Sequence, residues 1–265
     1  MDQIDVGGLR IAYESVGEGP PLVLLQGFVG NGRSTWQHQL SGLSDEFRVV
    51  AWDAPGAGRS SDPPASFRMP DYADCLAGFL DALSLRSVHL GGLSFGGALA
   101  LEFYRRRPTV PMTLVLAGAY AGWSGSLPAD VVEQRLSRSL EAADLAPAQF
   151  VGSMIPTMFS EAASPDTIDG FAESVAEFHP AGFRAMARSL AEADLRDVLR
   201  RIDVPTLLMY GDKDVRAPLS VGEDLHAAIP TSSLVVLPGA GHVSSVEAPE
   251  LFNSELRTFL HNTRR

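Results

Sequence analysis

The sequence contains one cysteine, Cys75, among its 265 residues. An internal disulfide is therefore impossible, and the fold must be stabilised by burial of apolar side chains. Because Cys75 falls at an apolar position of a helical pattern, we interpret it as a packing residue rather than a nucleophile. Long apolar runs are also missing. None approaches the roughly 18 residues of a membrane-spanning helix, and residues 1–5 are acidic and lack the apolar stretch of a signal peptide.

A basic excess is absent as well. Lys and Arg total 21 against 32 Asp and Glu, which gives a formal net charge of −11 at pH 7. Nucleic-acid binders carry a basic face, and proteins that bind anionic lipid carry a polybasic patch. The charge balance therefore argues against both kinds of partner. We expect a cytoplasmic protein, a monomer or a homodimer, that acts on a small molecule.

What the sequence does contain is a regular alternation of strand-like and helix-like segments. Continuous apolar runs of four or five residues are typical of strands buried on both faces, and helices show apolar residues at i, i+3, i+4 and i+7. The predicted strands are residues 9–13, 22–25, 48–52, 87–90, 112–116, 206–210 and 234–237. The predicted helices between and after them are residues 35–43, 72–83, 98–106, 220–228 and 251–260. This alternation predicts a mainly parallel sheet with helices on both sides.

The alternation is interrupted between residues 120 and 195, where no convincing strand occurs. The best helix candidates there are residues 135–143, 172–178 and 183–193, separated by prolines. We therefore predict one core formed by residues 1–119 and 196–265, with residues 120–195 inserted between its two parts.

A candidate nucleophile follows the strand that ends at residue 90. Residues 92–96 read Gly-Leu-Ser-Phe-Gly and fit the pattern G-x-S-x-G, in which a serine occupies a sharp strand-to-helix turn. Glycines two residues away on either side prevent side-chain clashes in that turn. The motif alone is common by chance, but the preceding strand and the following helix place Ser94 where the chemistry requires it.

A serine hydroxyl needs a base within hydrogen-bond reach, and the base needs an orienting acid. Asp214 follows the strand at 206–210, and His242 follows the strand at 234–237. Both loops are expected at the same edge of a parallel sheet as Ser94. Asp212 competes with Asp214 for the role of the acid, although it is also suited to cap the turn. No acidic residue directly follows the strand at 112–116, where the acid would otherwise be sought.

In combination and order, these features resemble the α/β-hydrolase superfamily over nearly the whole chain. The resemblance depends on Gln-Gly-Phe at residues 26–28, the Asp-Ala-Pro-Gly-Ala-Gly-Arg-Ser turn at 53–60, the Ser94 elbow, and the loops of Asp214 and His242. It implies the α/β-hydrolase fold, with a mostly parallel, eight-stranded-type sheet flanked by helices and a helical cap at residues 120–195. The turn at residues 53–60 is interpreted as structural, because it does not meet the dinucleotide-binding pattern.

The resemblance also implies roles for individual residues. The main-chain N–H groups of Phe28 and Phe95 would form the oxyanion hole. Gln26 stands where relatives usually have histidine, and we assign it to the substrate pocket together with Trp123, Met158 and Phe159. Other apolar side chains of the cap that could line the pocket, or only pack it against the core, are Met154, Phe171 and Phe178.

The predicted activity is hydrolysis of a small to medium, largely apolar ester or lactone through an acyl-enzyme intermediate. Neither a cofactor nor a metal is expected. Three alternatives remain: cleavage of an activated C–C bond, cofactor-free perhydrolase chemistry on the same residues, and a non-catalytic ligand-binding protein on the same scaffold.

Overall fold

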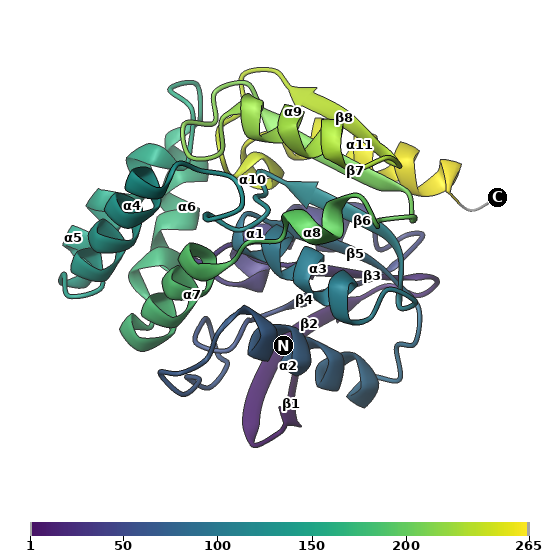
Figure 1. The fold of residues 1–265 in the computed structure, drawn as a ribbon, viewed down its shortest axis with the longest axis horizontal. Helices are drawn as coiled ribbons and strands as arrows, with labels where there is room; N and C mark the ends of the chain where they lie inside the picture. The colour runs from purple at the N-terminus through teal and green to yellow at the C-terminus, as the bar shows by residue number, and fades with distance from the viewer. Residues whose placement is uncertain (1, 264–265) are drawn as a thin grey trace.

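The structure is a computed structural model that describes residues 2–263, and a single eight-stranded sheet runs through its centre (Figure 1). The strand order is β1-β2-β4-β3-β5-β6-β7-β8. The strands are β1 (Asp2–Val6), β2 (Leu9–Val16), β3 (Pro21–Leu25), β4 (Arg48–Trp52), β5 (Val88–Leu93), β6 (Pro111–Ala117), β7 (Thr206–Gly211) and β8 (Ser232–Leu237).

The two strands at the amino-terminal edge are antiparallel, and the remaining six are parallel. β1 pairs with β2 and β2 with β4 in antiparallel register, whereas β4, β3, β5, β6, β7 and β8 follow one another in parallel. The predicted mainly parallel sheet is confirmed. β1 was not predicted, because its residues are largely exposed and polar and give no apolar run.

Helices cover both faces of the sheet. α2 (Met69–Ala82) packs on α3 (Phe95–Arg106), which also contacts the short α8 (Arg196–Leu199), and α9 (Leu219–Ala228) packs on β7 and β8. On the other face, α1 (Gly32–Gly42) packs on α10 (Ser244–Glu247) and α11 (Pro249–Asn262). Right-handed crossovers place α1 on one face and α2, α3 and α9 on the other, because the chain runs from β3 to β4 in one direction and from β4 to β8 in the other.

The sheet core is apolar on both sides, as expected for parallel strands. All residues of β5 and β7 are buried. Trp36 and Trp52 are among the largest fully buried side chains. Within residues 2–263, no helix has both the length and the apolar character needed to cross a membrane.

Between β6 and β7 the chain forms a separate group of helices, which Figure 1 shows together at one end of the sheet. These are α4 (Ala129–Ala142), α5 (Pro147–Met154), the 3-10 turn η1 (Ile155–Thr157), α6 (Pro165–Ala176) and α7 (Pro180–Glu192). Three of the helices begin with proline, which is favoured there because the first helical N–H has no partner. α5 was not predicted. The division of the chain into a core and a cap stays a prediction.

Candidate active site

Ser94 lies at the sharp turn between β5 and α3. Its backbone has φ 54° and ψ −108°, and only Ser84 shares a positive φ among the non-glycine residues 2–263. Such a conformation costs about 1–3 kcal/mol and persists only where the surroundings impose it. Here the Ser94 N–H donates to the carbonyl of Ala117 at the end of β6 (2.8 Å).

The flanking glycines make the turn possible. A Cβ at Gly92 would overlap the main chain of Gly96, and a Cβ at Gly96 would overlap the carbonyl of Leu25. Any larger residue at either position would push β5, α3 and β3 apart. The Ser94 side chain caps no N–H of α3, so its hydroxyl is not used by the helix.

His242 and Asp214 form a buried pair. Nδ1 of His242 lies 2.7 Å from Oδ2 of Asp214, and both side chains are at most 3% exposed. The other carboxylate oxygen, Oδ1, accepts hydrogen bonds from the N–H groups of Arg216 and Ala217, both at 2.8 Å. Because an ionised carboxylate only accepts, the His242 Nδ1 donates and its Nε2 is left as an acceptor.

Gly118, directly after β6, lies against this pair. Its φ is +48°, and a Cβ there would stand 3.1 Å from Nδ1 of His242 and 3.2 Å from Oδ2 of Asp214. The loop after β6, which contains no acidic residue, therefore packs closely against Asp214 and His242.

Ser94 and His242 face one small cavity of about 10 Å³, lined by Gly27, Phe28, Val29, Leu93, Ser94, Met158, Phe171, His242 and Val243. A space of this size holds about one water molecule. The Ser94 hydroxyl forms no hydrogen bond with His242 or with any other group of residues 2–263. Such bonds are often long before substrate binds.

The main-chain N–H groups of Phe28 and Phe95 are free of protein partners within residues 2–263. Phe28 lines the cavity that contains Ser94. Phe95 is the first residue of α3, where the N–H has no intrahelical acceptor. The two unused donors thus belong to the residue that follows Ser94 in the chain and to a residue that lines the same cavity.

Of the four residues assigned to the substrate pocket, the structure brings only Met158 to this cavity. Gln26 is fully buried, donates to the Gly30 carbonyl (3.1 Å) and accepts from the Ala54 N–H (3.3 Å). Its amide thus fastens the Phe28 loop to the segment after β4. Trp123 packs edge-on against Phe28 and Phe159 against Phe171, one layer behind the cavity lining.

The turn at residues 53–60 is stabilised by Asp53. Its carboxylate accepts from the N–H groups of Gly32 (2.8 Å) and Arg59 (2.9 Å), and the Ser60 hydroxyl donates to its carbonyl (2.6 Å). Burial raises the pKa of the Asp53 carboxyl, against the lowering effect of these N–H donors. The carboxylate is fully engaged in the turn and lines no part of the Ser94 cavity.

Two carboxylates that sequence analysis did not assign to the site hold the loop of His242. Asp212 accepts from the Gly239 N–H at 2.7 Å, which is the turn-capping use considered for it. Glu247 accepts from the N–H of Gly241 (2.8 Å) and of Ser160 (3.1 Å). No local motif marks Glu247, because its partners are distant in sequence or are main-chain groups.

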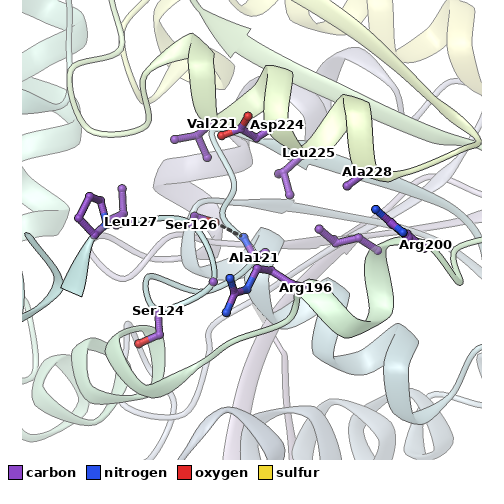
Figure 2. Close-up of a pocket in the computed structure, with 13 residues that line it drawn as sticks. Ala121, Ser124, Ser126, Leu127, Arg196, Arg200, Val221, Asp224, Leu225 and Ala228 are labelled. Carbon is purple, nitrogen blue, oxygen red and sulfur yellow. Dashed lines mark hydrogen bonds between the residues drawn. The ribbon is translucent and has the colours of Figure 1, made fainter.

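Larger cavities lie elsewhere. One of about 510 Å³ lies between α8, α9 and residues 121–128, and Figure 2 shows Arg196, Arg200 and Asp224 around it. Neither Ser94 nor His242 lines it, so it is separate from the candidate site. Within residues 2–263, no group of three or more His, Cys, Asp or Glu side chains is arranged to hold a metal ion.

The fold and this geometry define a class of protein. A family model described as alpha/beta hydrolase fold matches residues 20–249, and the chain belongs to that family.

Individual relatives are similar over nearly their whole length. The chain is 27% identical to 3-oxoadipate enol-lactonase 2 of Acinetobacter baylyi, covering 95% of this chain and 93% of the relative. It is 32% identical to a Pseudomonas syringae protein provisionally named carbamate hydrolase RutD, covering 92% and 94%. A thermophilic esterase from Thermogutta terrifontis, solved with malate bound, matches 100% of both chains with a TM-score of 0.92 and 30% identity. The chain is therefore a hydrolase enzyme of this fold.

Proposed function

We propose that the protein is a serine hydrolase that cleaves carboxylic esters or lactones, with Ser94 as nucleophile, His242 as general base and Asp214 as the orienting acid. The observation that supports this most strongly is the buried 2.7 Å contact between His242 and Asp214, with His242 and Ser94 lining one cavity. The relatives named as an enol-lactonase and an esterase favour this substrate class.

In the proposed reaction, Nε2 of His242 takes the proton of Ser94 as the hydroxyl oxygen attacks the ester carbonyl. The tetrahedral intermediate collapses to an acyl-enzyme when His242 returns the proton to the leaving alkoxide. Water, deprotonated by His242, then attacks the acyl carbonyl, and Ser94 leaves with the proton. Asp214 stays ionised and holds the imidazole in the tautomer that accepts at Nε2.

The N–H groups of Phe28 and Phe95 are the proposed oxyanion hole. Both lack protein acceptors, and the position of Ser94 at the N-terminus of α3 favours the developing negative charge. Removing one such donor typically costs about 3 kcal/mol of transition-state stabilisation. Because the donors are main-chain groups, glutamine at position 26 leaves them intact.

Residues 120–195 are the proposed cap. Met158 and Phe171, both from this segment, line the Ser94 cavity, and the Met158 carbonyl accepts from the Val243 N–H (3.1 Å). A cavity of about 10 Å³ is too small for an ester, so substrate entry requires these side chains to move. A cap that reclosed would exclude water until the acyl-enzyme has formed.

The same residues would also cleave a carbamate, and the relative named as a carbamate hydrolase favours including that substrate. The test is a panel of p-nitrophenyl esters of rising chain length, a lactone set and a p-nitrophenyl carbamate, each with wild type and Ser94→Ala. We expect turnover of at least one class, and its loss in Ser94→Ala with an unchanged unfolding temperature. Equal turnover by both proteins would reject the assignment.

A further inference from the structure

A second cavity, of about 520 Å³, lies between α4, α5 and residues 215–216. Three arginines, Arg135, Arg138 and Arg216, line it together with a single acidic residue, Glu141. The charged side chains of this lining thus give a formal excess of two positive charges, against a net charge of −11 for the whole chain. Its remaining lining includes Trp123 and Thr157.

The linings of the two cavities are connected at two places. The Arg216 guanidinium lies over the ring of Phe28, 5.3 Å from its centroid, and Phe28 lines the Ser94 cavity. Thr157 lines the arginine cavity, and the next residue, Met158, lines the Ser94 cavity. The Phe28 ring, and the step from Thr157 to Met158, therefore lie between the arginine cavity and the Ser94 cavity.

Arg216 is a half-buried cation without an acidic partner among residues 2–263. Its Nη1 donates to the Thr157 hydroxyl at 2.7 Å. The nearby Asp214 is not available to it, since one carboxylate oxygen binds His242 and the other accepts from main-chain N–H groups. Burial lowers the pKa of the Arg216 guanidinium, which nevertheless stays charged at neutral pH.

Arg135 is fixed beside it. Its guanidinium donates to the Tyr120 hydroxyl (2.9 Å) and to the Arg216 carbonyl (3.0 Å), and lies 6.0 Å from the Trp123 ring centroid. It too forms no ion pair with a carboxylate within residues 2–263. Two guanidinium groups that are partly removed from water and lack a counter-ion form a favourable place for an anion.

We propose that Arg216, supported by Arg135, binds a carboxylate carried by the substrate, so that the enzyme prefers anionic esters or lactones over neutral ones. This inference rests on the proposed function. The carboxylate would occupy the arginine cavity while the reacting carbonyl lies at Ser94, on the other side of Phe28. Planar guanidinium groups bind a carboxylate in a bidentate manner, which would also fix the orientation of the substrate.

The test compares two substrates of equal length. Monoethyl hexanedioate carries a terminal carboxylate where ethyl hexanoate carries a methyl group, and a pH-stat follows both. The readout is the ratio of kcat/KM for the anionic to the neutral ester, which does not depend on the fraction of folded enzyme. Arg216→Gln should lower this ratio at least tenfold, mainly through a higher KM for the anionic ester, and Arg216→Lys should lower it less.

The matched control is Arg200→Gln, which removes an equal charge from an exposed residue of the separate cavity in Figure 2. It should leave the ratio within about twofold of wild type. A ratio unchanged in Arg216→Gln, or lowered equally in Arg200→Gln, would overturn the inference.

Binding without turnover separates this inference from the proposed function. Calorimetry of hexanedioate with Ser94→Ala should show binding that weakens at least tenfold in Ser94→Ala/Arg216→Gln. If wild type cleaves neither ester, the proposed function fails, and this binding measurement alone decides the carboxylate site. The carboxylate site is rejected if Ser94→Ala and Ser94→Ala/Arg216→Gln bind hexanedioate equally, or if neither variant binds it.

Discussion

The carboxylate of Glu247 accepts a hydrogen bond from the main-chain N–H of Gly241, with 2.8 Å between Oε2 and N. Gly241 immediately precedes His242, and the same carboxylate also accepts from the N–H of Ser160 in the proposed cap. Glu247 therefore joins the histidine loop to the inserted helices. We assign it the role of a positioning residue that acts through His242.

Replacing Glu247 with Gln should lower kcat for p-nitrophenyl butyrate about fivefold to tenfold, because a neutral amide accepts more weakly than a carboxylate from the Gly241 N–H, by about 1 kcal/mol. KM should change less than kcat, since Glu247 lines no part of the Ser94 cavity. The control is Glu250→Gln, an exposed residue in the first turn of α11. Identical kinetics for the two variants would show that the Gly241 contact is irrelevant to catalysis.

Gly118→Ala should reduce activity as well as stability. The added methyl group would press on His242 and Asp214, and the backbone φ of +48° is unfavourable for alanine by about 1–2 kcal/mol. Gly239→Ala is a matched control, since Gly239 also has a positive φ of +76° but has no atom within 4 Å of an added Cβ. We expect both variants to melt earlier and only Gly118→Ala to lose most of its kcat. Full activity in Gly118→Ala would contradict the described packing.

Phe171→Ala should shift chain-length preference. Phe171 lines the Ser94 cavity, so truncating its ring enlarges the space available to an acyl chain. The ratio of kcat/KM for p-nitrophenyl octanoate to butyrate should rise severalfold, at a cost of about 3–5 kcal/mol in stability.

The control for this prediction is Phe178→Ala. Phe178 belongs to the same inserted segment and stacks on Phe150 away from the cavity. Its truncation should lower stability without raising the octanoate ratio. A similar rise in both variants would indicate general loosening of the cap rather than a larger pocket.

Glu102 on α3 provides a test of pH-dependent stability. Its side chain is 1% exposed and pairs with Arg105, yet burial raises the pKa of its carboxyl. The folded chain thus holds this proton more tightly than the unfolded chain. The resulting stabilisation is complete below the unfolded-state pKa of about 4.3 and is lost as pH rises through the folded-state pKa.

Glu102→Gln does not titrate, so its stability relative to wild type should increase as pH rises above about 4.3. Urea unfolding at several pH values measures the difference. Glu133→Gln removes the same charge from an exposed position of α4 and should show no such trend. A Glu102→Gln advantage that shrinks as pH rises would mean that the raised pKa is wrong.

The elements that depend on chain topology can be predicted from the sequence. The parallel strands end at one edge of the sheet, so the loops of Ser94, Asp214 and His242 had to converge there whatever the details of side-chain packing. The strand runs themselves were visible because burial on both faces demands apolar residues, as in β5 and β7. β1 escaped prediction because an exposed edge strand has no such requirement.

Side-chain direction could not be predicted in the same way. Gln26 is predicted in the substrate pocket, and the structure adds that its amide hydrogen-bonds to the main chain of Gly30 and Ala54. Trp123 and Phe159 are predicted in the substrate pocket; Trp123 packs on Phe28 and lines the arginine cavity, and Phe159 packs on Phe171. In each case the orientation depends on partners from other segments, which apolar periodicity does not encode. The same holds for Arg216, whose position over Phe28 follows only from tertiary packing.

The central claim is that Ser94 is an activated nucleophile. The most direct measurement is labelling of the purified protein with a fluorophosphonate, followed by mass spectrometry of the proteolytic peptides. We expect a single adduct on Ser94 that forms rapidly in wild type and much more slowly in His242→Ala. An unlabelled protein, or an adduct on a different residue, would contradict it.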